Sequence, residues 1–310
     1  MKCIEIANKL IAIYGDEWLI KDFSRRVQFR NVLDIQKTDL KVMLKVVKVL
    51  NRTIPISSGI YEPVFDETGF SRNILGICEL YFVARENTIF VNYINCHSKD
   101  NREIIVDATL QFVSLSMLYL DILPFHGALV ISNGCGIILA GQSGAGKSTL
   151  EFSLVNAGMK FFSDDIFFLG NDGWIYNNGE YIMGLREDAI NKLRISSDFF
   201  RERVSGGKRI IDMRMKAYND HRVKVKYIFF PLGGNQKKGH SIIQLSREET
   251  IIKLLELTIS EKLPSEFKHK YFKSLSRLVK TLKSYEIKRS LSCDDFETEQ
   301  ICKDILRIVK

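Results

Sequence analysis

The chain has 310 residues, 45% of them hydrophobic, which is enough for one large domain or two ordinary domains with packed cores. Its N-terminus, MKCIEIANKL, carries Glu5 inside a short apolar run and lacks a small-residue cleavage site, which argues against a signal peptide. The formal net charge is +8. The six cysteines form no CxxC pair, which argues against a zinc site and favours reduced thiols in a cytoplasmic protein. The cysteines are Cys3, Cys78, Cys96, Cys135, Cys293 and Cys302.

The N-terminal part of the chain predicts a small α+β domain over residues 1–100, a candidate for substrate binding. The apolar segments ILGICELYFVAR and TIFVNYI flank Glu86-Asn87, and this pattern predicts a β-hairpin. The polar run HSKDNRE, residues 97–103, is expected to mark the boundary with a second domain over residues 101–310.

The second domain begins with the longest apolar stretch, residues 104–125. Asp107, Gln111 and Asp121 interrupt it, so we expect an amphipathic helix over 104–122 and no membrane span. Two apolar runs then flank Asn133-Gly134, which predicts a tight hairpin.

The segment after this hairpin alternates between helix and strand signals. A helix is expected from Lys147 to about Ala157, ended by Gly158, and the segment KFFSDD predicts a strand that can lie next to the strand before the helix. The segment IFFLGNDGWIYN predicts another hairpin, which turns at residues 171–173.

The C-terminal region is expected to be helical to its end. Ser246 and Glu249 form the pattern of a capping box at the start of the first helix. Residues 262–289 hold nine Lys or Arg residues against two Glu, which is most of the excess positive charge. On a helix Lys270, Lys273, Arg277 and Lys280 would form a basic stripe, either a solvated face or a docking surface for an acidic partner. The nine are Lys262, Lys268, Lys270, Lys273, Arg277, Lys280, Lys283, Lys288 and Arg289.

The segment GQSGAGKST matches the P-loop pattern GxxxxGK[ST], with an apolar strand before it and a helix after it. In such a loop the backbone N–H groups and the positive end of the helix dipole bind phosphate. Lys147 is expected to reach the β- and γ-phosphates of ATP, and the Ser148 hydroxyl to bind Mg²⁺. The expected nucleotide-binding residues are Gly141, Gln142, Ser143, Gly144, Ala145, Gly146, Lys147, Ser148 and Thr149.

Asp164 and Asp165 follow Lys147 by 17 and 18 residues, at the end of the strand after the P-loop helix. Two carboxylates there can divide two tasks, binding Mg²⁺ and accepting a proton from an attacking hydroxyl. His126 starts the strand that forms a hairpin with the P-loop strand, and it joins Asp164, Asp165 and Lys147 as a candidate catalytic residue.

The segments FHGALVI, GQSGAGKST and FFSDDIFFL, in this order and at these spacings, resemble the catalytic domain of bacterial HPr kinase/phosphorylase and its relatives. The resemblance implies an α/β fold, a P-loop kinase domain related to phosphoenolpyruvate carboxykinase with a mixed sheet, and transfer of the ATP γ-phosphoryl group to a serine hydroxyl. It makes His126 the active-site histidine and the Asp164-Asp165 pair the catalytic base and metal contact, without assigning the two roles.

The chain also departs from that family. Gln142 and Thr149 replace acidic residues of the family's P-loop, and Tyr181 stands where the family's later signature has a glutamate. These departures favour a divergent relative, such as the kinases that phosphorylate a serine of a ribosomally made precursor peptide, for example a lasso peptide. The candidate substrate contacts are Arg186, Lys208 and Arg209.

Three functions remain open. The first is an ATP-dependent serine kinase of a peptide or protein, the second a kinase of a small-molecule alcohol, and the third a nucleotide-gated regulatory protein. A pure sensor needs no base, so the aspartate pair and His126 disfavour the third. Aromatic residues are sparse in the basic segment, which ranks nucleic acid last among partners. A homo-oligomer stays open.

Overall fold

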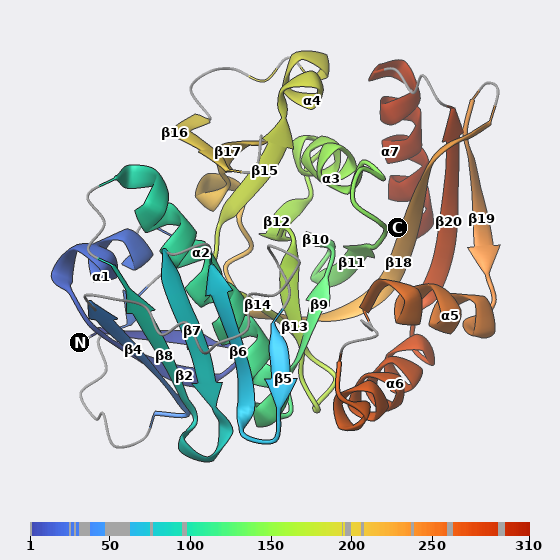
Figure 1. Cartoon of the computed structure of the whole chain (residues 1–310). Helices are drawn as coiled ribbons and strands as arrows, with labels where there is room; N and C mark the ends of the chain where they lie inside the picture. Colours follow the sequence, from blue (N-terminus) through green and yellow to red (C-terminus); the bar gives the residue numbers. More distant parts are fainter. Residues whose placement is uncertain are drawn as a thin grey trace. The chain divides into compact units, whose positions relative to one another are not determined.

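The computed structural model describes residues 2–24, 26–27, 29–30, 38–46, 63–74, 77–94, 98–193, 195, 200–205, 208–236, 239–258, 263–290 and 295–310. Within these residues the chain forms two compact units, Met1–Pro124 with Ser260–Lys268, and Phe125–Ile259 with His269–Lys310. Both units are mixed α/β (Figure 1).

The first unit is built on a mixed sheet that contains eight of the described strands, in the order β3-β1-β2-β4-β8-β7-β6-β5. The pairs β2/β4 and β4/β8 are parallel, and the other neighbours are antiparallel. The strands are β1 (Lys2–Ile6), β2 (Lys9–Tyr14), β3 (Phe29–Arg30), β4 (Leu40–Val46), β5 (Val64–Asp66), β6 (Gly69–Ile74), β7 (Cys78–Val83) and β8 (Thr88–Tyr93). The helices are α1 (Glu17–Ser24), the 3-10 turns η2 (Ala84–Glu86) and η3 (Met117–Leu120), and α2 (Lys99–Ser116).

The hairpin predicted at Glu86-Asn87 is confirmed, since η2 joins β7 to β8 and Asn87 adopts the left-handed conformation at its end. Helix α2 starts at the cap residue Ser98, whose hydroxyl accepts the Asn101 N–H, and it buries apolar side chains such as Phe112. Because α2 packs on β7 and β8, the first compact unit extends to Pro124, beyond the domain boundary predicted near residue 100.

One of the described helices, Asp100–Leu120, is long and apolar enough to cross a membrane by length and composition alone. Of its apolar window, 56% is buried inside the protein, as in a core helix of a soluble protein.

The second unit contains a large mixed sheet and a small one. The large sheet runs β12-β10-β11-β18-β14-β13-β9, and β20 pairs with both β18 and β19. Its strands are β9 (Leu123–His126), β10 (Ala128–Ser132), β11 (Cys135–Leu139), β12 (Lys160–Ser163), β13 (Ile166–Leu169), β14 (Ile175–Asn177), β18 (Arg222–Gln236), β19 (Ser241–Leu245) and β20 (Lys283–Ser290). The small sheet has the order β15-β17-β16, with β15 (Ile182–Arg186), β16 (Phe200–Ser205) and β17 (Lys208–Asp212).

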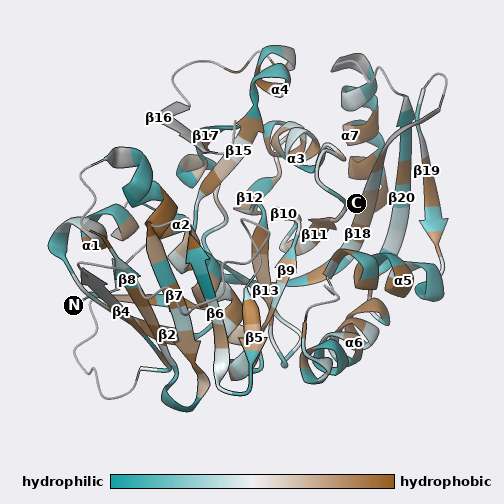
Figure 2. Cartoon of the chain, in the orientation of Figure 1, coloured by the Kyte–Doolittle hydropathy of each residue, from teal (hydrophilic) through white to brown (hydrophobic). Residues whose placement is uncertain are grey.

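The helices of the second unit are α3 (Lys147–Asn156), α4 (Glu187–Lys192), the 3-10 turn η5 (Arg214–Lys216), α5 (Arg247–Thr258), α6 (Ser265–Val279) and α7 (Asp295–Val309). Helix α3 packs on β10 of the large sheet, and α4 packs on β15 of the small sheet. Helices α3 and α7 lie side by side (Figure 1), and both bury apolar residues in one core with β10, β11 and β18. In Figure 2 α5 and α6 carry hydrophilic and hydrophobic colours along their length, as helices with one buried face do.

Several sequence predictions for this unit are confirmed. Asn133 and Gly134 both have positive φ in a two-residue turn between β10 and β11, α3 ends just before Gly158, and β13 and β14 form the predicted hairpin. The capping box is also present, because Ser246 and Glu249 exchange side-chain to backbone hydrogen bonds of 3.1 and 2.8 Å.

Two predictions were wrong. The acidic strand β12 is not next to the P-loop strand β11, because β10 lies between them and pairs with both. The C-terminal region is not wholly helical either. Residues 283–290 form β20, where pairing with β18 and β19 prevails over the local helical pattern and buries Ser284, Glu286 and Ile287.

The helical part of the basic stripe is therefore shorter than predicted. Helix α6 ends at Val279, so Lys280 follows it, and Lys273, Arg277 and Lys280 are exposed while Lys270 is partly buried. Lys262, Cys96 and Cys293 lie outside the described residues. Within the described residues no disulfide joins Cys3, Cys78, Cys135 or Cys302.

Candidate active site

The P-loop lies between β11 and α3. Ala140 is buried at the end of the strand, and the chain then turns through residues 141–146 into the helix. Gly144 and Gly146 have φ of +83° and +81°, a conformation that costs glycine little and other residues more. The glycines of the motif thus meet a local backbone requirement, and a loop of this type can bind an anion through its backbone N–H groups.

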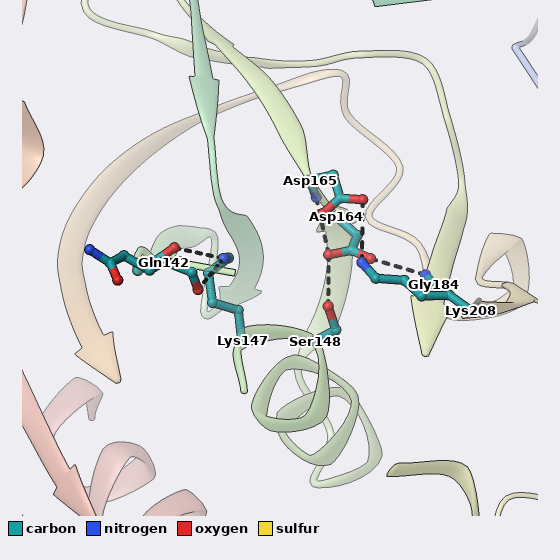
Figure 3. A network of polar contacts seen from close by, with 8 residues as sticks. Gln142, Lys147, Ser148, Asp164, Asp165, Gly184 and Lys208 are labelled. Carbon is teal, nitrogen blue, oxygen red and sulfur yellow. Dashed lines mark hydrogen bonds and ion pairs between the residues drawn. The ribbon is translucent and has the colours of Figure 1, made fainter. Parts of the chain in front are cut away.

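Lys147, the first residue of α3, turns back across this loop. Its Nζ donates to the Gly141 carbonyl at 2.7 Å and to the Gln142 carbonyl at 3.2 Å (Figure 3). The side chain is buried, and this burial lowers the pKa of Lys147, although the negative charges of Asp165 and Asp164 act the other way. The lysine therefore lies in the loop where phosphate would bind. Gln142, Ser143 and Gly144 are exposed at the loop's tip.

The two aspartates follow β12 directly but differ in environment. Asp164 is buried, with 8% of its surface exposed, and its carboxylate accepts hydrogen bonds from the Ser148 hydroxyl at 3.3 Å and from the Gly184 N–H at 3.1 Å (Figure 3). Burial and the neighbouring Asp165 raise the pKa of Asp164 to about 7, opposed by the Gly184 N–H.

Asp165 is exposed and adopts a positive φ of 65°. The Nζ of Lys208 lies 3.9 Å from its Oδ2. Two carboxyl groups adjacent in sequence therefore differ in exposure, one being buried and the other in contact with solvent. A pair in different environments can divide metal binding and proton transfer between its members.

His126 ends β9 beside this pair. The N–H of the next residue, Gly127, donates to the Asp165 carbonyl at 3.0 Å, which joins the histidine strand to the aspartate turn. Partial loss of hydration, followed by the positive charge of Lys147, lowers the pKa of His126, while the charge of Asp165 raises it. The net lowering favours a neutral imidazole at neutral pH.

The three candidate substrate contacts do not lie together. Arg186 and Lys208 are cross-strand partners on β15 and β17, so they share one face of the small sheet, and Lys208 reaches Asp165. Arg209 alternates to the other face, where its Nε lies 2.9 Å from Glu187. The structure therefore brings Lys208 to the aspartates and directs Arg209 elsewhere.

Sequence reasoning missed three contributors. Glu151, one turn beyond Lys147 on α3, is fully buried and lies close to Asp164. Burial, and then the charges of Asp164 and Asp165, raise the pKa of Glu151 well above its usual range. An acidic residue four positions after the P-loop lysine was the available signal. The other two, the Gly184 N–H and Arg289, come from distant strands and leave no local signal.

The residues at the site fit Mg²⁺ when a nucleotide is bound. No cluster of three or more His, Cys, Asp or Glu side chains suited to a metal ion occurs in the described part of the chain. Mg²⁺ in kinase sites needs fewer, because phosphate oxygens and water complete its shell. The Ser148 hydroxyl and the Asp164 carboxylate already converge, and Asp165 is adjacent.

Comparisons with known proteins agree with the sequence motifs over a limited part of the chain. No family model matches. HPr kinase/phosphorylase of Clostridium beijerinckii is 39% identical over 62 residues, which cover 18% of this chain and only 20% of that relative. The solved structure of the Hpr(Ser) kinase/phosphatase from Coxiella burnetii aligns with 60% of this chain and 90% of its own at 12% identity and a TM-score of 0.28. The sequence match confirms that this chain resembles HPr kinase/phosphorylase, as a divergent relative.

Proposed function

We propose that this protein is an ATP-dependent kinase that transfers the γ-phosphoryl group to a serine hydroxyl of a peptide or protein. The observation that carries the proposal is the contact between the P-loop and the acidic pair, with Ser148 bonded to Asp164 and Asp165 exposed beside it. A nucleotide-gated sensor would need the loop but not the second, exposed carboxylate. The proposed fold type is a P-loop kinase domain of the HPr kinase and phosphoenolpyruvate carboxykinase type, in a cytoplasmic protein.

The donor half of the site would bind MgATP. The loop N–H groups and Lys147 would hold the phosphates, and Ser148 with Asp164 would hold Mg²⁺, which neutralises charge on the phosphates when bound. In this arrangement Lys147 exchanges its present carbonyl partners, Gly141 and Gln142, for phosphate oxygens. Burial of the lysine strengthens its interaction with an anion because water competes less.

The acceptor half would use Asp165. The serine oxygen attacks the γ-phosphorus, the bond from that phosphorus to the bridging oxygen breaks, and ADP leaves with the electron pair. The hydroxyl proton passes to the Asp165 carboxylate, which is exposed and so can be reached by an incoming serine. Lys208, close to Asp165, would place positive charge near the transferring group, and neutral His126 would orient the acceptor.

We propose a flexible segment of a peptide or protein as acceptor, including a ribosomal precursor peptide, because in-line attack requires close delivery of the oxygen and a chain end can enter such a site. The contacts described above define the donor side, so a small-molecule alcohol is the competing acceptor. The positive charge of Lys208 and Arg186 favours an acceptor that carries negative charge.

The test is mass spectrometry of serine-containing candidate peptides and of free alcohols after incubation with ATP and Mg²⁺. We expect phosphoserine with the wild-type protein and none with Lys147→Ala, whose fold is checked by circular dichroism. Equal transfer by a folded Lys147→Ala protein would reject the P-loop assignment. Phosphorylation of an alcohol and of no peptide would replace the proposed acceptor class.

A further inference from the structure

The C-terminal strand β20 brings an arginine against the P-loop. Nη2 of Arg289 donates to the carbonyl of Ala145 at 2.7 Å. A Cβ placed on Gly146 would lie 2.3 Å from Nη2 and 2.7 Å from Nη1, so the guanidinium is packed directly on the loop backbone. The glycine before Lys147 is thus required by this arginine as well as by its own positive φ.

The hydrogen bond acts on one peptide plane. In a trans peptide the C=O and the following N–H point in opposite directions, because the unit is planar. When Arg289 holds the Ala145 carbonyl on one side, the Gly146 N–H is held on the other. Gly146 is the cap residue of α3, where the N–H groups of the loop and the helix dipole both favour an anion.

We propose that Arg289 is a positioning residue for nucleotide binding, which fixes the Ala145–Gly146 peptide so that the Gly146 N–H is directed at a nucleotide phosphate. The inference rests on the proposed function, since it assumes that the loop binds the β- and γ-phosphates. It adds a role for a residue from the far end of the chain. Among the described residues the guanidinium makes this one hydrogen bond, so it has further N–H donors.

The surrounding structure holds Arg289 in place. Strand β20 pairs in parallel with β18 through register partners such as Pro231 and Ile287, and a Cβ on Gly141 would lie 3.3 Å from the Pro231 carbonyl. The next residue, Ser290, donates its N–H to Glu297 of α7 at 2.9 Å, and its hydroxyl also bonds that carboxylate. Both ends of the P-loop therefore rest on the β18–β20 pair, which gives the arginine a rigid base.

The experiment compares Arg289→Ala, Arg289→Lys and the control Lys288→Ala for binding of MgATP, MgADP and AMP by isothermal titration calorimetry. Lys288 carries the same charge one residue away but faces Glu286, at 3.5 Å, and Glu286 keeps Lys253 as a partner at 2.7 Å when Lys288 is removed. Loss of a charged hydrogen bond predicts a roughly 10- to 100-fold weaker affinity of Arg289→Ala for MgATP and MgADP. AMP affinity should change less than about threefold, because AMP lacks the phosphates that the loop binds.

Two further readouts separate positioning from general stability. We expect Arg289→Lys, which keeps the charge and a single donor nitrogen in place of the guanidinium, to bind MgATP with an affinity between those of wild type and Arg289→Ala. In the nucleotide-free protein, hydrogen exchange of a peptide covering residues 141–150 should be faster in Arg289→Ala than in Lys288→Ala. If Arg289→Ala does not fold, Arg289→Lys carries the comparison.

A folded Arg289→Ala protein that binds MgATP with wild-type affinity would overturn the inference about Arg289 and leave the proposed function standing. If Arg289→Ala does not fold, wild-type affinity of Arg289→Lys would have the same meaning. An equal loss in Lys288→Ala would also overturn the inference, because the effect would then come from net charge. If the wild-type protein binds no MgATP, the proposed function falls, and the nucleotide role of Arg289 with it.

Discussion

The candidate site has two parts that differ in origin. Its donor part is continuous in sequence, running from β11 through the P-loop and α3 to the aspartates after β12. The other part comes from remote strands, namely the Gly184 N–H on β15, Lys208 on β17 and Arg289 on β20. The donor part follows a local backbone pattern, whereas the remote part depends on which strands pair with which. We expect substitutions in the two parts to differ in the size of their effects.

The largest effect is expected for the acidic pair. Asp165→Asn should reduce phosphoryl transfer about 10²- to 10⁴-fold while MgATP affinity is retained, because a proton acceptor is lost. Asp164→Asn should instead raise the Mg²⁺ concentration needed for half-maximal binding of ATP, because a carboxylate ligand is lost. Titrations of rate and affinity against Mg²⁺ separate the two. If Asp165→Asn changes the Mg²⁺ requirement and Asp164→Asn changes the rate, the roles of base and Mg²⁺ ligand are exchanged. If both variants keep at least a third of the wild-type rate, both assignments are rejected.

His126→Ala provides a reference point within the same site. A neutral histidine that only orients the acceptor should cost less than the base, so we expect a decrease in rate below about 10²-fold. Nucleotide affinity should not change. A loss equal to that of Asp165→Asn would make His126 a proton carrier instead.

The remote part is tested by the neighbouring cations Lys208 and Arg209. Lys208→Ala should lower kcat/KM roughly tenfold or more, because it removes a charge beside Asp165. Arg209→Ala serves as the matched control, since it faces Glu187 on the other side of the small sheet. Steady-state kinetics measure both. Equal effects would show that the face of β17 does not matter.

A stability effect is expected for Glu151. Its carboxyl group is fully buried, and this burial raises the pKa of Glu151 well above its usual range, so Glu151→Met should raise the free energy of unfolding by about 1–3 kcal/mol. Urea unfolding of the nucleotide-free protein measures this change. Glu256→Met, at an exposed position of α5, should change it by less than about 0.5 kcal/mol. A destabilised Glu151→Met protein would mean that the carboxyl group has a stabilising role.

The smallest effect is expected for the exposed end of the basic stripe. Reversal of Lys273, Arg277 and Lys280 to Glu should raise the KM for an acidic peptide about three- to tenfold and weaken its dependence on salt, because exposed charges are screened. ATP affinity is the internal control and should not change. An unchanged peptide KM in the folded triple variant would identify the stripe as a solvated face.

Prediction from sequence succeeded where neighbouring residues decide the conformation. Asn133-Gly134 supports positive φ at both turn positions, and the P-loop glycines supply the left-handed turns before Lys147. It failed for Lys283–Ser290, whose charged and polar residues suit several conformations until β18 and β19 pair with them. The sequence also did not contain the strand register that places Lys208 and Arg209 on opposite faces of the small sheet, and the role of Arg186, Lys208 and Arg209 as substrate contacts stays a prediction.

The sequence by itself determined the curl of the P-loop, the helix after it and the placement of two carboxylates at a strand end. Those features depend on glycine backbone freedom, hydrophobic periodicity and contacts within a few residues. Only the tertiary structure decided that Asp164 is buried and Asp165 exposed, that Lys208 rather than Arg209 reaches them, and that Arg289 packs on Gly146. Those features depend on strand pairing and burial between segments that are far apart in the sequence, so no single local segment decides them.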